Sequence, residues 1–411
     1  MAMKEGERNR VDVAIAGGGH VGLTLALALR QADPNLALTL IDAAPPEAIE
    51  RDSRASAIAA AGRRMLETLG VWPEIAADAQ PIHEMVITDS RTRDAVRPVF
   101  LTFDGTLESG EAFAHMVSNR TMVRALRDKA RASGVKILAP QTVRDFSVHP
   151  GHVDARLGDG ETIAARLLVA ADGARSHLRD LAGISTVHWG YGQSGIVVTV
   201  AHEKPHGGRA EEHFLPGGPF AILPLAGNKC SLVWSERTAE AERVVADPLL
   251  FEVELERRFG HRLGRIEILD KPRAFPLGLT LARHFVQPRF ALAGDAAHGI
   301  HPIAGQGLNL GFRDVAALAE TIVDARRLGL DIGSPAVLER YERWRRFDAF
   351  EMGVTTDVLN RLFSNDMPVV RFVRDFGLGL VDRLPRLKDY FIRQAAGEAD
   401  ESPRLLRGEA I

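Results

Sequence analysis

The sequence predicts an α/β fold that is divided between two kinds of sheet and ends in helices. Short apolar runs that stop at glycine alternate with helical patterns in residues 11–42 and again from 290 onward, which is typical of parallel strands covered by helices. From 188 to 276, strand-like runs separated by Gly and Pro turns predict a mostly antiparallel sheet. Past 328, apolar residues recur at helical spacing, so we expect a helical C-terminus.

Length and composition exclude several classes of protein. The 411 residues are enough for two or three domains, and a net charge of −3 with mixed signs gives no basic surface for nucleic acid. The single cysteine, Cys230, excludes an internal disulfide and a cysteine cluster, and we expect no metal site. We see no secretory signal, and the apolar stretches are shorter than the roughly 20 residues that span a bilayer. We therefore expect a cytoplasmic protein, and we expect any membrane contact to be peripheral, on the inner face of the membrane.

The first motif lies near the N-terminus. A β-branched run, residues 11–16, leads into Gly17-x-Gly19-x-x-Gly22, and a helical pattern follows. Asp42 ends the next strand and is placed to accept hydrogen bonds from a ribose. Strand, turn, helix and acid together predict a dinucleotide site, although this motif does not distinguish NAD from FAD.

The next segment, residues 52–69, reads as a loop followed by a helix, with Arg54 just ahead of the helical part. An arginine there either meets a pyrophosphate or caps a surface, and spacing alone leaves both open. A second helix, 122–132, has Ser118 or Asn119 as its candidate cap.

Two further buried strands end at an acid beside a glycine, the first at Asp172-Gly173 and the second at Gly294-Asp295. After the second, the loop Gly305–Gly307 opens a helix whose apolar residues begin at Leu308. Glycines let the backbone approach a ligand, and the free N–H groups of a helix start favour an anion. This stretch therefore suits an anionic or electron-rich cofactor.

Two parts of the remaining chain bear on its organisation. The antiparallel part is expected to contain one helix, residues 248–259. The last segment, 368–396, has a basic amphipathic pattern. Such a tail lies on an anionic membrane, against partner subunits, or packed on its own domain, and the pattern does not choose among them.

The three motifs, in this order, resemble the single-component flavin monooxygenases of the p-hydroxybenzoate hydroxylase type. The stretch GDAAHGIHPIAGQGLNLGFRD and the tail with LNRLFSND and GLGLVDRLPRLK are similar to the ubiquinone-biosynthesis branch of that family. The resemblance implies a discontinuous Rossmann-like FAD-binding domain, an inserted β-sheet substrate domain and a C-terminal helical segment. Their expected ranges are 1–80, 102–184 and 283–345 for the first, 81–101 and 185–282 for the second, and 346–411 for the third.

The resemblance also implies FAD as the cofactor. Asp42 departs from the family pattern, which usually has glutamate at this position, but the shorter carboxylate does not change the expected cofactor. The expected cofactor-binding residues are Gly17, Gly19, Gly22, Asp42, Arg54, Arg120, Val143, Asp172, Gly173, Gly294, Asp295, Pro302, Gly305, Gln306, Gly307, Leu308 and Asn309.

The expected reaction is hydroxylation of a polyprenylated phenol in ubiquinone biosynthesis. NAD(P)H or another donor would reduce FAD, dioxygen would form a C4a-hydroperoxide, and the ring would attack its distal oxygen. His301, Pro302 and Tyr191 are candidates for helping the reaction, although the histidine can also simply fix its loop and the tyrosine can be core packing. Two alternatives stay open: a reductase or dehydrogenase of a prenylated substrate, and a flavin-binding scaffold among quinone-biosynthesis complex partners.

Overall fold

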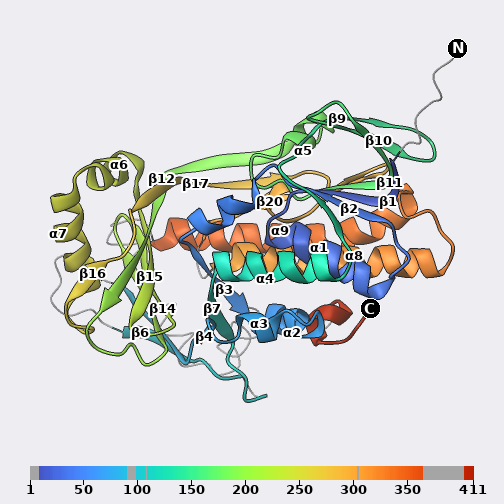
Figure 1. Cartoon of the computed structure of the whole chain (residues 1–411). Helices are drawn as coiled ribbons and strands as arrows, with labels where there is room; N and C mark the ends of the chain where they lie inside the picture. The colour runs from blue at the N-terminus through green and yellow to red at the C-terminus, as the bar shows by residue number, and fades with distance from the viewer. Residues whose placement is uncertain (1–8, 90–98, 108, 303–304, 364–401) are drawn as a thin grey trace, which may run out of the picture.

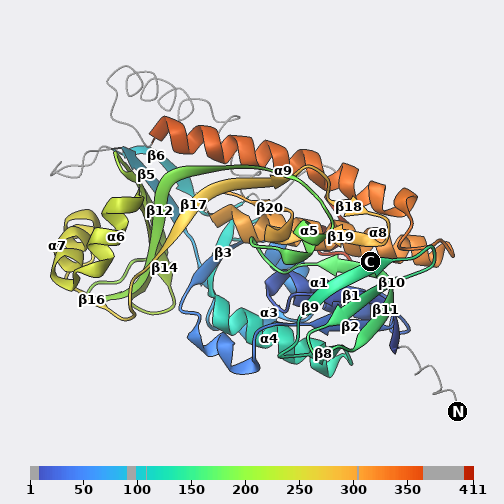
Figure 2. The same cartoon turned by 90° about the horizontal axis from the view of Figure 1, so that it is seen from above.

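The computed structural model of the chain describes residues 9–89, 99–107, 109–302, 305–363 and 402–411. Figure 1 shows two sheets at opposite ends of an elongated molecule, joined by the long strands β12 (Thr186–His202) and β17 (Arg273–Ala282). The helix α9 (Pro335–Phe363) runs along one side of the molecule past both sheets (Figure 2). The predicted basic tail, 368–396, lies outside the described residues.

The first sheet is mostly parallel, as the sequence predicts. Its central strand β1 is buried on both faces, with Val13, Ala14 and Ile15 fully inaccessible. Along the sheet the order is β18 (Val286–Gln287), β19 (Phe290–Leu292), β11 (Thr162–Ala170), β1 (Asn9–Ala16), β2 (Leu38–Ile41) and β8 (Lys136–Leu138), with β10 (Val153–Leu157) and β9 (Val143–Val148) antiparallel beside β11.

Helices cover this sheet and join it to a small three-stranded sheet. Helix α1 packs against α4 and α8, and their apolar sides belong to the main core. The helices are α1 (His20–Ala32), α2 (Ala60–Thr68), α3 (Trp72–Ile75), α4 (Asn119–Ala132), α5 (His177–Leu181) and α8 (Gln306–Arg327), and the small sheet contains β3 (Ala55–Ala59), β7 (Ala114–Ser118) and β4 (Gln80–Pro81).

The second sheet is antiparallel except where β13 pairs with β5 in parallel. One face packs under α6 (Thr238–Ala246) and α7 (Pro248–Phe259) around Trp234, Phe220 and Phe251. The strand order is β20 (His298–Gly299), β17, β12, β15 (Lys229–Arg237), β14 (Gly218–Leu225), β13 (Arg209–Leu215), β5 (Glu84–Asp89) and β6 (Val99–Asp104), with β16 (Ile266–Ile268) beside β12. The opposite face of this sheet lines a cavity.

Two expectations about local structure are wrong, and a third is right in part. The chain after Arg54 forms the strand β3, and the helix begins only at Ala60, because Ala55–Ala59 pairs with β7. The antiparallel part contains α6 as well as the expected helix α7. Of the two candidate caps of α4, Ser118 is the N-cap residue, although its side chain makes no capping hydrogen bond, and Asn119 lies inside the helix.

The C-terminal residues return to the first sheet's side of the molecule. Leu405 and Leu406 are buried in the main core, and Arg404 pairs with Asp324 of α8 at 2.6 Å. Among the helices of the described ranges, none combines the length and apolar character needed to cross a membrane.

Candidate functional site

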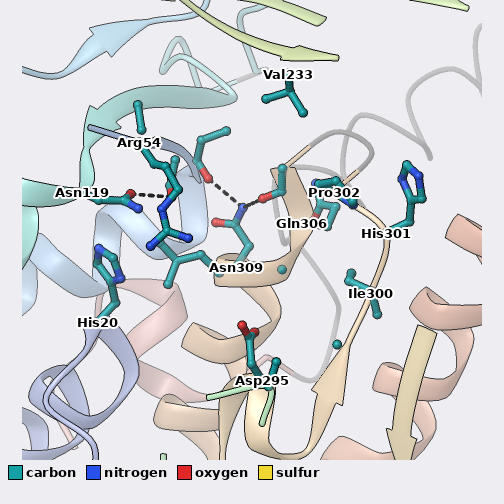
Figure 3. Close-up of a pocket in the computed structure, with 18 of the residues that line it drawn as sticks. His20, Arg54, Asn119, Val233, Asp295, Ile300, His301, Pro302, Gln306 and Asn309 are labelled. Carbon is teal, nitrogen blue, oxygen red and sulfur yellow. Dashed lines mark hydrogen bonds between the residues drawn. The ribbon is translucent and has the colours of Figure 1, made fainter. Parts of the chain in front are cut away.

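A cavity of about 860 Å³ lies where the two sheets meet. Figure 3 shows His20, Arg54 and Asn119 on one side of it, Asp295 below, and Ile300 and His301 on the other side. The free face of the second sheet supplies a mostly apolar wall that includes Met85, Ala221, Leu223 and Val233. The predicted residues that line the cavity are Gly19, Arg54, Gly173, Asp295, His301, Pro302, Gly305, Gln306, Gly307, Leu308 and Asn309.

The first glycine motif forms a tight turn with one open position. Gly17 has φ of +119°, and a Cβ on it would lie 2.1 Å from the carbonyl oxygen of Ala171. A Cβ on Gly22 would lie 1.9 Å from the carbonyl oxygen of Gly17. By contrast, a Cβ on Gly19 would meet nothing within 4 Å, and Gly19 faces the cavity. Two of the glycines therefore close the turn, and the third leaves space for a ligand.

This turn presents the start of α1 to the cavity. Gly19 is the N-cap of the helix, with no side-chain cap, and the first turn carries no acidic residue. The first N–H groups of a helix have no partner within it and carry partial positive charge. The backbone geometry thus fits an anionic group such as a pyrophosphate.

Asp42 is buried at the end of β2, and it does not line the cavity. Arg127 Nη2 donates to Asp42 Oδ2 at 2.8 Å, and the Ala44 N–H donates to Asp42 Oδ1 at 3.2 Å. A Cβ on Gly18 would lie 2.3 Å from Asp42 Oδ2, so the turn tolerates only glycine above this carboxylate. Arg127 was missed from the sequence; the only signal was a charged residue on the buried side of α4.

The Asp172-Gly173 turn is held from within. Asp172 accepts hydrogen bonds from Ser176 Oγ at 2.6 Å and from the Leu178 N–H at 3.3 Å. Gly173 has φ of +86°, lines the cavity, and would have open space around a Cβ. Arg179 donates to the carbonyl oxygen of Ala296 at 3.1 Å, which ties this turn to the one beside Asp295.

Asp295 faces the cavity from a turn that is fixed by Asp314. Asp314 Oδ2 accepts from the Gly294 N–H at 2.8 Å and lies 2.6 Å from His298 Nε2. Desolvation raises the pKa of Asp295, and His298 and Arg54 oppose the rise. A Cβ on Gly294 would lie 2.8 Å from Val21 Cγ2, so glycine is needed for the close approach of α1.

The start of α8 is a second uncapped helix end at the cavity. Gly305, with φ of +64°, is the N-cap of the helix. Gly305 and the next two residues, Gln306 and Gly307, line the cavity. Asn309 uses both amide hydrogens within the protein, donating to the carbonyl oxygens of Ala57 at 2.9 Å and Gly305 at 3.1 Å. Its Oδ1 accepts from the Ala59 N–H at 2.9 Å, so this side chain fastens the loop to β3.

Of the two arginines expected to bind the cofactor, one lines the cavity and the other does not. Arg54 lines the wall and pairs with Asp52 at 2.8 Å. Arg120 is exposed and does not line the cavity. The neighbouring Asn119 lines it, and Asn119 Oδ1 accepts a hydrogen bond from Ser56 Oγ at 2.7 Å. Val143, also expected at the cofactor, is buried in the main core at the start of β9 and does not line the cavity.

His20, the first residue of α1, was missed from the sequence. Its Nε2 is buried without a hydrogen-bond partner in the part of the chain that the structure describes, and the residue lines the cavity. Burial lowers its pKa to about 4, against an opposing effect of Asp52, so the ring is neutral at pH 7. A neutral ring with a free nitrogen can donate to or accept from a bound ligand.

Tyr191 and His301 come together, with ring centroids 5.4 Å apart and ring planes at 63°. Both nitrogens of His301 are buried without a hydrogen-bond partner among the described residues, and burial lowers its pKa to about 4. Burial and the nearby Asp357 raise the pKa of Tyr191, which does not line the cavity. At neutral pH the pair is therefore a neutral imidazole beside a neutral phenol.

A carboxylate on the apolar wall was also missed. Glu212 of β13 lines the cavity and is 4% exposed. Burial raises its pKa to about 7. No short motif marks this residue, since its position depends on how distant strands pair.

The composition led us to expect no metal site. Within the described ranges, His149, His152 and Asp154 bring ligand atoms within 4.8 Å of one another on the β9–β10 hairpin. None of the three lines the cavity, so the site described above does not use them.

The chain is similar over most of its length to several known proteins. Residues 10–352 match the protein family described as FAD binding domain. The chain is 46% identical to ubiquinone hydroxylase UbiL of Rhodospirillum rubrum over 97% of this chain and 92% of that protein. It is 37% identical to 3-demethoxyubiquinol 3-hydroxylase of Escherichia coli over 94% of this chain and 98% of that protein. The crystal structure of p-nitrophenol 4-monooxygenase from Pseudomonas putida has the same fold, with a TM-score of 0.78 at 18% identity, over 96% of this chain and all of that one.

Proposed function

Because the chain belongs to the FAD binding domain family, we propose that it is an FAD-dependent monooxygenase that hydroxylates the aromatic ring of a polyprenylated phenol in ubiquinone biosynthesis. The relatives named for this activity share more than a third of their residues with the chain over nearly its whole length. The roles proposed for individual residues rest on the site geometry.

The observation that carries the proposal is the continuity of the cavity. One end is lined by Gly19 and Asp295, beside the glycine turns and the two open helix N-termini. The other end is lined by the apolar face of the second sheet, with Leu223 and Val233. A charged cofactor and an apolar substrate would therefore share one continuous cavity, as transfer of oxygen between them requires.

We assign the cofactor-binding roles from this geometry. The open space at Gly19 and the N-terminus of α1 support pyrophosphate binding, and Asp295 faces the same cavity for the ribityl chain. The N-terminus of α8 would favour negative charge on the ring system by about 0.3–2 kcal/mol. When bound, FAD supplies electron transfer and the activation of dioxygen.

The protein's own contribution is to position the ring and exclude water. The apolar wall removes a polyprenyl tail from water, which contributes roughly 25 cal/mol per Å² of apolar surface. Pro302, His301 and Tyr191 remain candidates for positioning the ring, since His301 and Pro302 line the cavity and Tyr191 packs on His301. NAD(P)H is the proposed reductant, and the sequence offers no second complete glycine motif for a nicotinamide domain.

The decisive experiment uses isotopic oxygen. The purified FAD-loaded protein receives NAD(P)H or a chemical reductant, a prenylated phenol and ¹⁸O₂, and the product is analysed by mass spectrometry. The expected result is one ¹⁸O atom in the ring. Oxidation of the substrate under anaerobic conditions would favour the reductase or dehydrogenase, and retention of FAD without any turnover would favour the scaffold.

We also propose that the segment 368–396 provides the peripheral membrane contact, on the inner face of the membrane, where the apolar substrate resides. Its basic and apolar residues alternate at helical spacing, which suits an anionic lipid surface. Contact with quinone-biosynthesis partners is the competing role for the same segment.

A further inference from the structure

Glu212 is an ionisable side chain on the otherwise uncharged part of the cavity wall that β13, β14 and β15 form. Its paired neighbours across the sheet are Ala221 on β14 and Ile87 on β5, neither of which titrates. Among the described residues that the second sheet contributes to the cavity, Glu212 is the one carboxylate. It is 4% exposed, so folding removes most of its surface from bulk water.

The adjacent Glu211 points to the opposite face of β13 and has a different environment. It lies 3.2 Å from His213 Nε2 and 3.3 Å from Arg209 Nε, and it pairs with Arg262. Burial opposes its charge, but His213 and Arg262 lower its pKa to about 2. Glu211 therefore has cationic partners, whereas its neighbour Glu212 has none among the described residues.

Glu212 makes no hydrogen bond or ion pair with any residue that the structure describes. Burying a carboxyl group without a partner is unfavourable, and such groups concentrate where a ligand or a reaction needs them. A phenol hydroxyl is a donor that a carboxylate accepts, and the substrate would bring it into the cavity that Glu212 faces.

We propose that Glu212 is the base that binds the hydroxyl group of the phenol substrate and takes its proton during hydroxylation. This inference rests on the proposed function. The O–H bond breaks, the proton moves to a carboxylate oxygen of Glu212, and the electron pair of that bond passes into the ring. The ring carbon then uses an electron pair to form the new C–O bond. Overall, one atom of dioxygen enters the ring, the other leaves as water, and the reductant supplies two electrons.

The apolar surroundings of Glu212 give it a pKa that suits a general base. Burial alone raises its pKa to about 7, and a base is most effective when its pKa lies near the working pH. Other titratable groups in the wall are His20, Arg54, Arg175, His188, Asp295 and His301. Comparison of the pH dependence of the wild type with that of Glu212→Gln therefore separates the contribution of Glu212 from that of these groups.

The test compares Glu212→Gln with the wild-type FAD-loaded protein. Glu84→Gln, on the neighbouring strand β5 and 42% exposed at its side chain, is the matched carboxylate-to-amide control. We expect Glu212→Gln to keep FAD, its visible spectrum and its rate of flavin reduction. Hydroxylation should fall by about 10²- to 10⁴-fold, the usual contribution of a general base, with hydrogen peroxide released instead.

Two further readouts separate a base from a structural support. In the wild type, kcat/KM should rise with pH to a plateau above about 7, and the Glu212→Gln protein should lack this rise. With the O-methyl ether of the same phenol, which has no proton to give, the two proteins should react at equal rates.

Equal hydroxylation of the phenol by wild type and Glu212→Gln would overturn the inference and leave the proposed function intact. An equal loss with phenol and methyl ether would also overturn it, because the side chain would then act on the shape of the site. A wild-type protein that hydroxylates no prenylated phenol would overturn both the proposed function and this inference.

Discussion

Arg345 Nε donates to Asp314 Oδ1 at 2.8 Å, and both side chains are buried in the core. Asp314 also accepts from the Gly294 N–H at 2.8 Å. Burial opposes the charge of Asp314, but His298 and Arg345 hold its pKa below the ordinary range. Helix α9 therefore controls, through one carboxylate of α8, the turn that aims Asp295 at the cavity.

The variant Arg345→Met should lower both the free energy of unfolding and FAD retention. Removing one partner of a buried ion pair destabilises a protein by about 3–5 kcal/mol when the remaining charge is uncompensated, so the loss here should be at or below that range, because His298 and the Gly294 N–H still contact Asp314. Urea denaturation with and without FAD measures the first effect, and equilibrium dialysis of FAD measures the second.

Arg340→Met is the matched control for Arg345→Met. Arg340 lies on the same helix and pairs with Asp324 at 3.0 Å, but its side chain is 46% exposed. Exposed pairs contribute about 0–1 kcal/mol, so this variant should unfold almost as the wild type does. Similar losses in both variants would contradict the role we give to Asp314.

Substituting the glycines of the first turn should separate folding from cofactor binding. Gly19→Ala places a methyl group in the open space, so the protein should fold normally and bind FAD about tenfold or more weakly, equivalent to about 1.4 kcal/mol. Gly22→Ala forces a Cβ to 1.9 Å from the carbonyl oxygen of Gly17, so it should destabilise the FAD-free protein by about 1–3 kcal/mol or more. Thermal unfolding without FAD and fluorescence titration with FAD distinguish the two. A Gly19→Ala protein with wild-type affinity would remove the pyrophosphate assignment.

The glycine turn could be predicted from the sequence because it depends only on residues that are close together in the chain. Gly17, Gly19 and Gly22 follow a strand and open a helix, and the structure has that order. The alanine-rich stretch after Arg54 favoured a helix by propensity alone, yet Ala55–Ala59 forms a strand because β7 pairs with it.

Long-range partners could not be predicted in the same way. The Arg127–Asp42 pair joins residues 85 positions apart, and no local pattern relates them. Likewise, which of Glu211 and Glu212 faces the cavity depends on how β13 lies between β14 and β5. A strand's alternation shows that adjacent residues face opposite ways, but only the assembled sheets show which face has cations and which has the cavity.

The proposed membrane contact is best tested by substitution. A deletion through the C-terminus would remove Leu405 and Leu406 from the core, so loss of membrane binding could reflect unfolding. Replacing Arg383, Arg386 and Lys388 together with Gln should instead weaken binding to anionic vesicles by about 3 kcal/mol, at about 1 kcal/mol for each basic residue. Cosedimentation with vesicles that contain phosphatidylglycerol measures the change.

The control for the tail carries the same loss of charge elsewhere. Arg265, Lys271 and Arg273 are exposed in β17 or in the loops beside β16, about 100 residues before the tail, and their replacement with Gln should leave vesicle binding unchanged. If both triple variants bind as the wild type does, the segment 368–396 does not anchor the protein by charge.

The buried carboxyl of Glu212 should make the protein less stable at higher pH. Its folded-state pKa of about 7 lies above the unfolded value of 4.5, so the folded chain holds a proton that the unfolded chain has released. The resulting stability is fully present below about pH 4.5 and is lost as pH rises through about 7, by roughly 3 kcal/mol. Glu212→Gln has no proton to lose, so it should match the wild type near pH 5 and exceed its free energy of unfolding by that amount near pH 8. Urea denaturation at both pH values, without substrate, measures the difference, and Glu84→Gln should show no such dependence on pH. A constant difference at the two pH values would mean that Glu212 is solvated or paired, and would remove the physical basis for its role as a base.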